Sequence, residues 1–458
     1  MKRFSLVFAL ALALAPRLAA ACGCFASTTV ASPVVQAGEQ ILFYIDGPNV
    51  VAHVQIFYSG ASDQFGWLLP LPAQPTLGVG DTAVFDALAQ ATQPIFSTTT
   101  INTCQGSRGG GGCSYGCGSY SSPVANAAGG AEDNGGPSIV VAQGNVGPYD
   151  YAILHADTRT ELTNWLNTNK YFVPTTSDVI SQYIHTGAFF VAIKLAAGMN
   201  VGDIKPLTLT YPSQLPMIPL TLTSATSAAN LPVTVYILGT ARAIPRNYYH
   251  AVIDPAALDW TTGVSDYADV VGRAVRETPT RRAFITQFTG DSSVVSANAT
   301  LEPIVSNFGN RKLTRLFGIF QPQDMTQDPV FSFNPDLADV PKQQSSQLTV
   351  ACDGSATLTV QPDGLMIPYR NNQPIVPLAS LPASLRVEIL REAGQPEVVI
   401  DHQSQIQAIL DGAPVPDATI TPVDGGDDGP ISLRGHAKLP WVIAMLPLLL
   451  LALRRRRS

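Results

Sequence analysis

Apolar and polar residues alternate along much of the chain, and this period of two predicts strands. In the run 50–58, for example, Val50, Val54 and Ile56 fall on one face. The residues Asp353-Gly354 separate two alternating runs and predict a hairpin. Further strands are predicted at 41–47, 65–72, 149–154, 189–195, 207–211, 232–238 and 283–288.

A helical period appears in only a few short segments. Asp81 is placed to cap a helix that buries Val84, Phe85 and Leu88. A capping box, 158–161, opens another helix. Two more are predicted, one from 177 to 184 and an amphipathic one that starts at Ser265. More strand than helix predicts an α+β body with a few short amphipathic helices.

Residues 1–21 have the layout of a secretory signal peptide, with Lys2 and Arg3 before a short apolar run. This run is too short to span a hydrocarbon core of about 30 Å. Cleavage after Ala21 leaves Cys22 as the first mature residue, so lipidation of this cysteine stays open as an alternative. The sequence therefore predicts export from a bacterial cytoplasm.

The apolar run 439–453 predicts one C-terminal transmembrane helix, joined to the body by a polar linker, 421–438. At 1.5 Å per residue it reaches about 22 Å, which is short for a span. The arginine cluster 454–458 is expected on the cytoplasmic side, because positive residues stay inside. The body is therefore expected in the bacterial cell envelope or on the surface, with later removal of the tail left open.

Composition divides the rest of the chain into four parts. A strand-rich part, 22–103, precedes a loop, 104–137, that is rich in glycine, serine and cysteine and cannot bury a core. A central α+β part, 138–345, and a strand-rich part, 346–420, follow. The glycine-rich loop lacks the flanking strand, helix and lysine of a phosphate-binding loop.

The exported body is acidic, although only 13% of the 458 residues are charged. Without the seven basic residues of the two ends (2, 3, 17 and 454–457), 20 of the 27 basic residues remain against 34 acidic ones, which gives a net charge near −14. Nucleic acid is not an expected partner, because phosphate binding requires clustered lysine and arginine.

Six cysteines in an exported chain predict disulfide bonds rather than a metal site. No CxxC spacing and no nearby histidine supports metal binding, and no cofactor is predicted. Fifteen connectivities are possible, and the sequence does not choose among them. The disulfide candidates are Cys22, Cys24, Cys104, Cys113, Cys117 and Cys352.

Polar and aromatic residues gather between Arg242 and Trp260, where they could anchor a binding partner. The alternative is that they are ordinary surface and capping residues. The candidate binding residues are Arg246, Tyr248, Tyr249, His250 and Trp260.

The sequence contains no HExxH motif, and it assigns no catalytic residue. Asp150, His155 and Asp157 lie near one strand end, but no nucleophile accompanies them. A non-enzymatic envelope protein that binds another protein or a surface polymer is therefore expected. An exported hydrolase of unfamiliar type remains the alternative, and convergence of Asp150, His155, Arg246 and His250 in one cleft would favour it.

Several short sequence segments, which occur in the same order, carry a resemblance to a known family between about residues 22 and 360. They include Ala21-Cys22-Gly23-Cys24-Phe25, Trp67-Leu68-Leu69-Pro70, Val146-Gly147-Pro148-Tyr149-Asp150-Tyr151 and Ala241-Arg242-Ala243-Ile244-Pro245. The chain resembles a family of exported bacterial proteins whose domain has no assigned function. This resemblance implies an address in the cell envelope, but no activity and no site residues.

Overall fold

The computed structural model describes residues 35–59, 65–103, 139–171, 178–185, 188–306, 311–361, 364–371, 373–389 and 397–423. The predicted signal peptide, the loop 104–137 and the predicted transmembrane helix 439–453 lie outside these ranges. Within them, no helix is both long and apolar enough to cross a membrane. Cys352 is the one described cysteine and is disulfide-bonded, while the disulfide framework as a whole stays a prediction.

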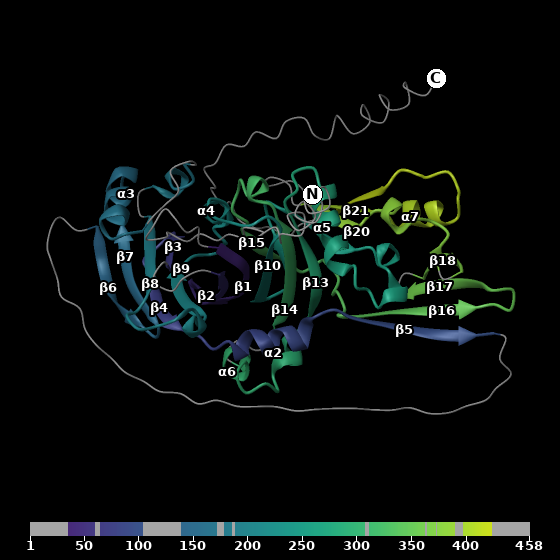
Figure 1. Ribbon diagram of the computed structural model, residues 1–458, viewed down its shortest axis with the longest axis horizontal. Coiled ribbons are helices and arrows are strands. Elements are labelled where there is room, and N and C mark those ends of the chain that lie inside the picture. Colours follow the sequence, from purple (N-terminus) through teal and green to yellow (C-terminus); the bar gives the residue numbers. More distant parts are fainter. Residues whose placement is uncertain are drawn as a thin grey trace, which may run out of the picture.

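An eleven-stranded mixed sheet forms the centre of the body (Figure 1). It begins with a hairpin that turns at Gly47, where a φ of +57° suits glycine. Strands from the three predicted parts other than the loop 104–137 join this sheet, so these parts share one framework. In spatial order the strands are β22 (Thr419–Val423), β21 (Glu397–Asp401), β20 (Ser384–Ile389), β12 (Tyr249–Ile253), β13 (Ala283–Asp291), β14 (Lys312–Phe320), β10 (Leu231–Gly239), β1 (Val35–Asp46), β2 (Asn49–Ser59), β9 (Leu207–Pro212) and β4 (Thr76–Val79).

A four-stranded sheet packs against one face of the central sheet. Its order is β3 (Gly66–Leu71), β8 (Phe189–Leu195), β7 (Tyr149–His155) and β6 (Val140–Val146). Trp67, Tyr149 and Val191 from this sheet meet Phe43 and Val235 from the central sheet in one apolar core. Burial of this area from both sheets is the main stabilising contribution to this half of the body.

Short helices cover the outer faces of the two sheets. α2 (Ala83–Thr92) and α6 (Glu302–Ser306) pack on the far side of the central sheet. α3 (Arg159–Thr168) lies on the four-stranded sheet and begins with the predicted capping box at Thr158. α4 (Leu220–Ser224) follows β9.

A five-stranded sheet lies at the other end of the body (Figure 1). Its order is β19 (Gln373–Pro374), β18 (Leu365–Arg370), β17 (Ser355–Gln361), β16 (Gln343–Val350) and β5 (Ile95–Asn102). Together with α5 (Tyr267–Glu277) and α7 (Gln403–Leu410) it encloses a second apolar core. β11 (Arg242–Pro245) and β15 (Phe331–Asn334) form a separate two-stranded ribbon.

The strand-rich α+β prediction is confirmed, as are the hairpin between β16 and β17 and the helix at α5. The predicted helix from 177 to 184 is wrong within the described residues. A single 3₁₀ turn, Ser181–Tyr183, stands there instead. The hydroxyl of Tyr183 accepts the backbone N–H of Leu222 (3.1 Å), which holds this segment as a turn against α4.

Candidate functional site

Two of the predicted binding anchors are core residues. Trp260 is 3% exposed, and its indole N–H donates to the carbonyl of Pro255 (2.8 Å). Tyr248 is also 3% exposed, and its hydroxyl donates to the carbonyl of Gln327 (2.6 Å). The prediction that these rings form an exposed surface is therefore wrong, because each fills space in a core and satisfies its one polar group internally.

Arg246 and Tyr249 are the members of the predicted set that retain partial exposure. Arg246 follows β11, and its backbone N–H donates to the carbonyl of Val330 (2.7 Å). Burial raises the pKa of Tyr249, and the nearby Arg282 offsets part of this effect. Two half-buried side chains do not make a broad contact surface, and binding through them stays a prediction.

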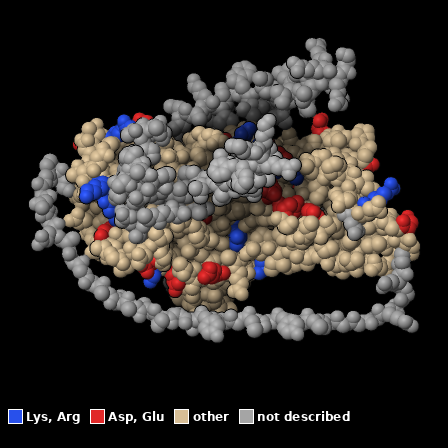
Figure 2. All heavy atoms as spheres, viewed as in Figure 1, with Lys and Arg blue, Asp and Glu red and all other residues tan. Residues whose placement is uncertain are grey.

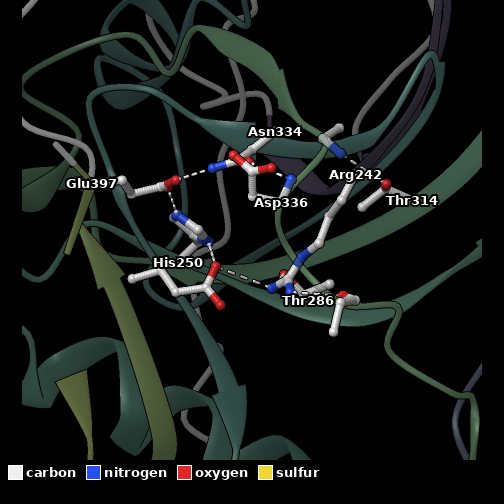
Figure 3. A network of polar contacts seen from close by, with 10 residues as sticks. Arg242, His250, Thr286, Thr314, Asn334, Asp336 and Glu397 are labelled. Atoms are coloured by element: carbon white, nitrogen blue, oxygen red, sulfur yellow. Dashed lines mark hydrogen bonds and ion pairs between the residues drawn. The ribbon is translucent and has the colours of Figure 1, made fainter. Parts of the chain in front are cut away.

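His250, the fifth predicted residue, lies at the centre of a buried ion-pair network (Figure 3). Its Nδ1 atom is 2.7 Å from Oε2 of Glu388, and its Nε2 atom is 3.0 Å from Oε1 of Glu397. The guanidinium of Arg242 lies 3.3 Å from the same oxygen of Glu388. Asn334 donates its side-chain N–H to the other oxygen of Glu397. We call Arg242, His250, Glu388 and Glu397 the buried charge network.

Strand pairing brings these residues together. His250 in β12 is the register partner of Glu388 in β20, so their side chains lie side by side on the same face. Glu397 is the first residue of the next strand, β21. Arg242 enters from β11 and also donates to the carbonyl of Ala338 (3.1 Å) and the hydroxyl of Thr286 (3.2 Å).

The network is balanced in charge when its histidine is protonated. Burial alone would lower the pKa of His250, but Glu388 and Glu397 outweigh burial and raise this pKa. Burial alone would raise the pKa of Glu388, but His250 and Arg242 outweigh it and lower this pKa. Two cations therefore face two carboxylates, which is the arrangement that makes buried charges tolerable.

The donor atoms of His250, Glu388 and Glu397 lie within 4.8 Å of one another and are of the types that bind divalent metals. However, both ring nitrogens of His250 already face carboxylates, and Arg242 supplies a second positive charge. The arrangement is therefore typical of a buried ion-pair network rather than of a metal site. Because His250 is 0% exposed, it offers no group to a substrate or a protein partner.

A second buried ionisable group lies between the two packed sheets. Glu39 in β1 is 6% exposed and shares the inner face of the sheet with Ile41 and Phe43. Burial raises its pKa to about 7, and contact with Gln36 offsets part of this rise. The adjoining cavity has a volume of about 30 Å³ and apolar walls that include Val54, Leu209 and Ile218. This space holds about one water molecule, which is too small for a substrate.

A hydrolase would be favoured if Asp150, His155, Arg246 and His250 converged in one cleft. In the described part of the structure these four residues do not contact one another. Asp150 and His155 belong to β7 of the four-stranded sheet, whereas His250 belongs to the central sheet. Asp150 accepts from the side chain of Asn145, and Nδ1 of His155 lies 2.9 Å from the carbonyl of Ala188. The described part of the structure places these residues on different sheets and does not bring them together with Arg246.

The solvent face of the five-stranded sheet is a surface that the sequence reasoning missed. Its opposite face buries Leu358, Val360 and Ile367 in the second core. On the solvent side the register aligns exposed or half-buried serine, threonine and glutamine side chains across three strands, and β18 adds three residues of other types. We call this the polar sheet face. Its residues are Ile95, Ser97, Thr99 and Ile101 on β5, Gln343, Ser345, Gln347 and Thr349 on β16, Ser355, Thr357, Thr359 and Gln361 on β17, and Met366, Pro368 and Arg370 on β18.

Charge is almost absent from this surface. Arg370 is the only charged residue of the polar sheet face, and β5, β16 and β17 contain none. The strip over β5 and β16, at the lower right of Figure 2, is accordingly tan. Ordinary solvated surfaces are rich in lysine, arginine, aspartate and glutamate. The alternation of serine, threonine and glutamine in 343–361 was the available sequence signal.

The fold and the two buried ionisable sites define a strand-rich α+β protein of packed sheets, without an assembled catalytic cleft among the described residues. A family described as an uncharacterized protein conserved in bacteria, DUF2330, matches residues 16–316, and the chain belongs to it. Neither the curated proteins nor the solved structures contain a match to the chain. The family match ends within β14, so it includes Arg242 and His250 but not Glu388, Glu397 or strands β16 to β19.

Proposed function

We propose that the protein is a non-enzymatic binding protein of the bacterial cell envelope whose polar sheet face binds an uncharged, hydroxyl-rich surface polymer. The observation that carries this proposal is the array of serine, threonine and glutamine side chains across β5, β16 and β17. A neutral polysaccharide is the class of polymer that fits such an array. This surface replaces the 242–260 segment as the proposed contact, because three of the predicted anchors there are buried.

The spacing of the array supports recognition of a repeating polymer. Neighbouring strands lie about 4.8 Å apart, and side chains on one face repeat about every 6.7 Å along a strand. Hydroxyl and carboxamide groups each provide donors and acceptors, so the face can satisfy hydroxyls in many orientations. On the same face, Gln343 donates to the hydroxyl of Ser97 (3.2 Å), which orders side chains of two adjacent strands.

The absence of charge selects among polymers. A polyanion would gain little from a face with one arginine and would be repelled by the acidic body, whose net charge is near −14 without the 7 basic residues of its ends (20 basic against 34 acidic). A neutral polymer has no such penalty. Exposed Ile95 and Met366 (44% and 54%) add apolar area of the kind on which the faces of sugar rings pack.

The proposal includes the address predicted from the two ends of the chain. Signal peptide 1–21 would deliver the body outside the cytoplasm, and helix 439–453 would tether it to the membrane. The linker 421–438 would leave the body free to reach a polymer nearby. The hydrolase alternative has no comparable support, because His250 is buried away from solvent and the cavity beside Glu39 holds about one water molecule.

A polysaccharide panel tests the proposal. Full-length chain in detergent is incubated with neutral and with polyanionic polysaccharides of matched length, and the bound fraction and the released reducing sugar are both measured. We expect saturable binding to at least one neutral polymer and no released sugar. Binding to polyanions alone contradicts the proposal, and hydrolysis of a bound polymer replaces it with the enzyme alternative.

Two threonine variants locate the binding surface. Thr359→Glu places a charge in the middle of the polar sheet face and should weaken binding at least tenfold. Thr419→Glu is the matched control, because Thr419 is an exposed strand residue on β22, outside this face. Equal binding by the two variants contradicts the assignment of the surface.

A further inference from the structure

β5 is an edge strand that lacks the usual protection. Among the described residues it pairs only with β16, and it ends the five-stranded sheet (Figure 1). It is 8 residues long and contains no proline, no charged residue and no bulge. Long, uncharged edges present unpaired backbone groups and readily pair with another strand.

The other described edge strands are protected in recognised ways. β3, β22 and β11 each contain a proline, β4 and β15 have 4 residues, and β19 has 2. β6 has a register shift between Val140 and Ala142. Proline, shortness and bulges all discourage the addition of a strand. β5 differs from these edge strands because it has none of the three features, and it is therefore the described edge most suited to pair with another strand.

The direction of the backbone groups identifies which residues are free to pair. The N–H group of Ile95 donates to the carbonyl of Lys342, just before β16 (2.8 Å), and that of Thr103 donates to the carbonyl of Val350, the last residue of β16 (3.1 Å). Alternate residues of a strand point their backbone groups to opposite sides. The even-numbered residues of β5, Phe96 to Asn102, therefore direct their N–H and C=O groups to the open edge.

We infer that β5 pairs with β5 of a second copy of this chain, antiparallel and centred on Thr98. In this register Phe96 pairs with Thr100 of the partner subunit, and Thr98 pairs with itself, so all hydrogen-bonded positions are even. The same register places Ile95 opposite Ile101 of the partner subunit. These are the exposed large apolar residues of β5, at 44% and 42%, and both lie on the polar sheet face.

The self-complementarity argues for a second copy over a different partner. Ile95 of each subunit lies opposite Ile101 of the partner subunit at a non-hydrogen-bonded position, where facing residues of antiparallel strands are closest. This apolar contact forms twice in each dimer. The threonines and serine between them pair without charge repulsion. This dimer joins two five-stranded sheets into one and extends the polar sheet face across both subunits, so the inference deepens the proposed function by doubling the length of polymer that one assembly can contact.

Sedimentation equilibrium of the full-length chain in detergent, without polysaccharide, tests the dimer. We expect twice the monomer mass at micromolar concentration. Thr100→Pro removes an N–H that β16 does not use, so it should raise the dimer dissociation constant at least tenfold and leave the thermal midpoint nearly unchanged. Thr359→Lys, on the same face but two strands from the edge, is the control and should leave the dimer intact.

A charge-swap pair tests the register. Ile95→Lys and Ile101→Glu should each weaken the dimer at least tenfold, because each places a charge opposite an isoleucine. The double variant places lysine opposite glutamate twice and should recover the dimer to within threefold of the original chain. A monomer at all concentrations overturns the inference, and so does a double variant as weak as the single ones. Polysaccharide binding is measured separately, so its failure leaves this result unaffected.

Discussion

Replacing Glu39 with glutamine should stabilise the folded chain at pH 8 and change it little at pH 4. Glutamine keeps the shape and the hydrogen-bonding carbonyl of the side chain but removes its charge. Glu39 is 6% exposed, and its Oε2 atom has no hydrogen-bond partner among the described residues. A charge at this position is therefore unfavourable, whereas a neutral group is tolerated.

The size of the effect follows from the pKa of Glu39. This pKa rises from 4.5 to about 7 on folding, so the folded chain holds its proton more tightly than the unfolded chain. The contribution of protonated Glu39 to the free energy of unfolding is fully present below pH 4.5. It is lost as the pH rises from 4.5 toward 7, and the loss stays constant at higher pH. Each tenfold difference in proton affinity is worth about 1.4 kcal/mol, which gives a loss of roughly 3 kcal/mol at pH 8.

Urea unfolding of the purified chain between pH 4 and pH 8 measures this effect. The original chain should lose stability across the window from 4.5 to 7, and Glu39→Gln should lose roughly 3 kcal/mol less. Glu302→Gln, an exposed glutamate on α6, is the control and should follow the original chain. If Glu39→Gln is no more stable than the original chain at pH 8, the carboxyl group is not held in an apolar environment and the reasoning fails.

Three further predictions concern the buried groups and the cysteines. His250→Leu leaves two buried glutamates facing one cation, Arg242, and should cost about 3–5 kcal/mol in urea unfolding, whereas Arg246→Ala should cost less than about 0.5 kcal/mol. Trp260→Ala should cost about 3–5 kcal/mol in the same assay, because it leaves a cavity in the core. A cost below about 1 kcal/mol would show that Trp260 is not a core residue. Disulfide mapping by mass spectrometry should find Cys352 in a disulfide bond, because its sulfur is disulfide-bonded in the structure; a free Cys352 thiol in the native chain contradicts this prediction.

Elements that depend on neighbouring residues were predictable from the sequence. The hairpin at Asp353-Gly354 and the capping box at Thr158 follow from turn and cap chemistry within a few residues, and both are present. The apolar face of α5 follows likewise from spacing alone. The order of the eleven-stranded sheet was not predictable, because β1 pairs with β10 and β12 with β20 across long stretches of chain.

The candidate site shows the same limit. His250 was selected from the sequence, but its partner Glu397 is 147 residues away, and only the fold brings them together. Trp260 was misplaced because a polar and aromatic composition suits both a binding surface and a core. The apolar residues just before it, Ala256, Ala257 and Leu258, are themselves buried and were the available warning.

The salt dependence of polymer binding tests the central claim most directly. A neutral polysaccharide is titrated against the full-length chain at about 0.05 M and about 0.5 M NaCl, a range over which charge-driven binding weakens steeply. We predict dissociation constants that agree within about twofold at the two salt concentrations. Affinity that falls tenfold or more with added salt would show that charges, and not the uncharged polar sheet face, hold the polymer.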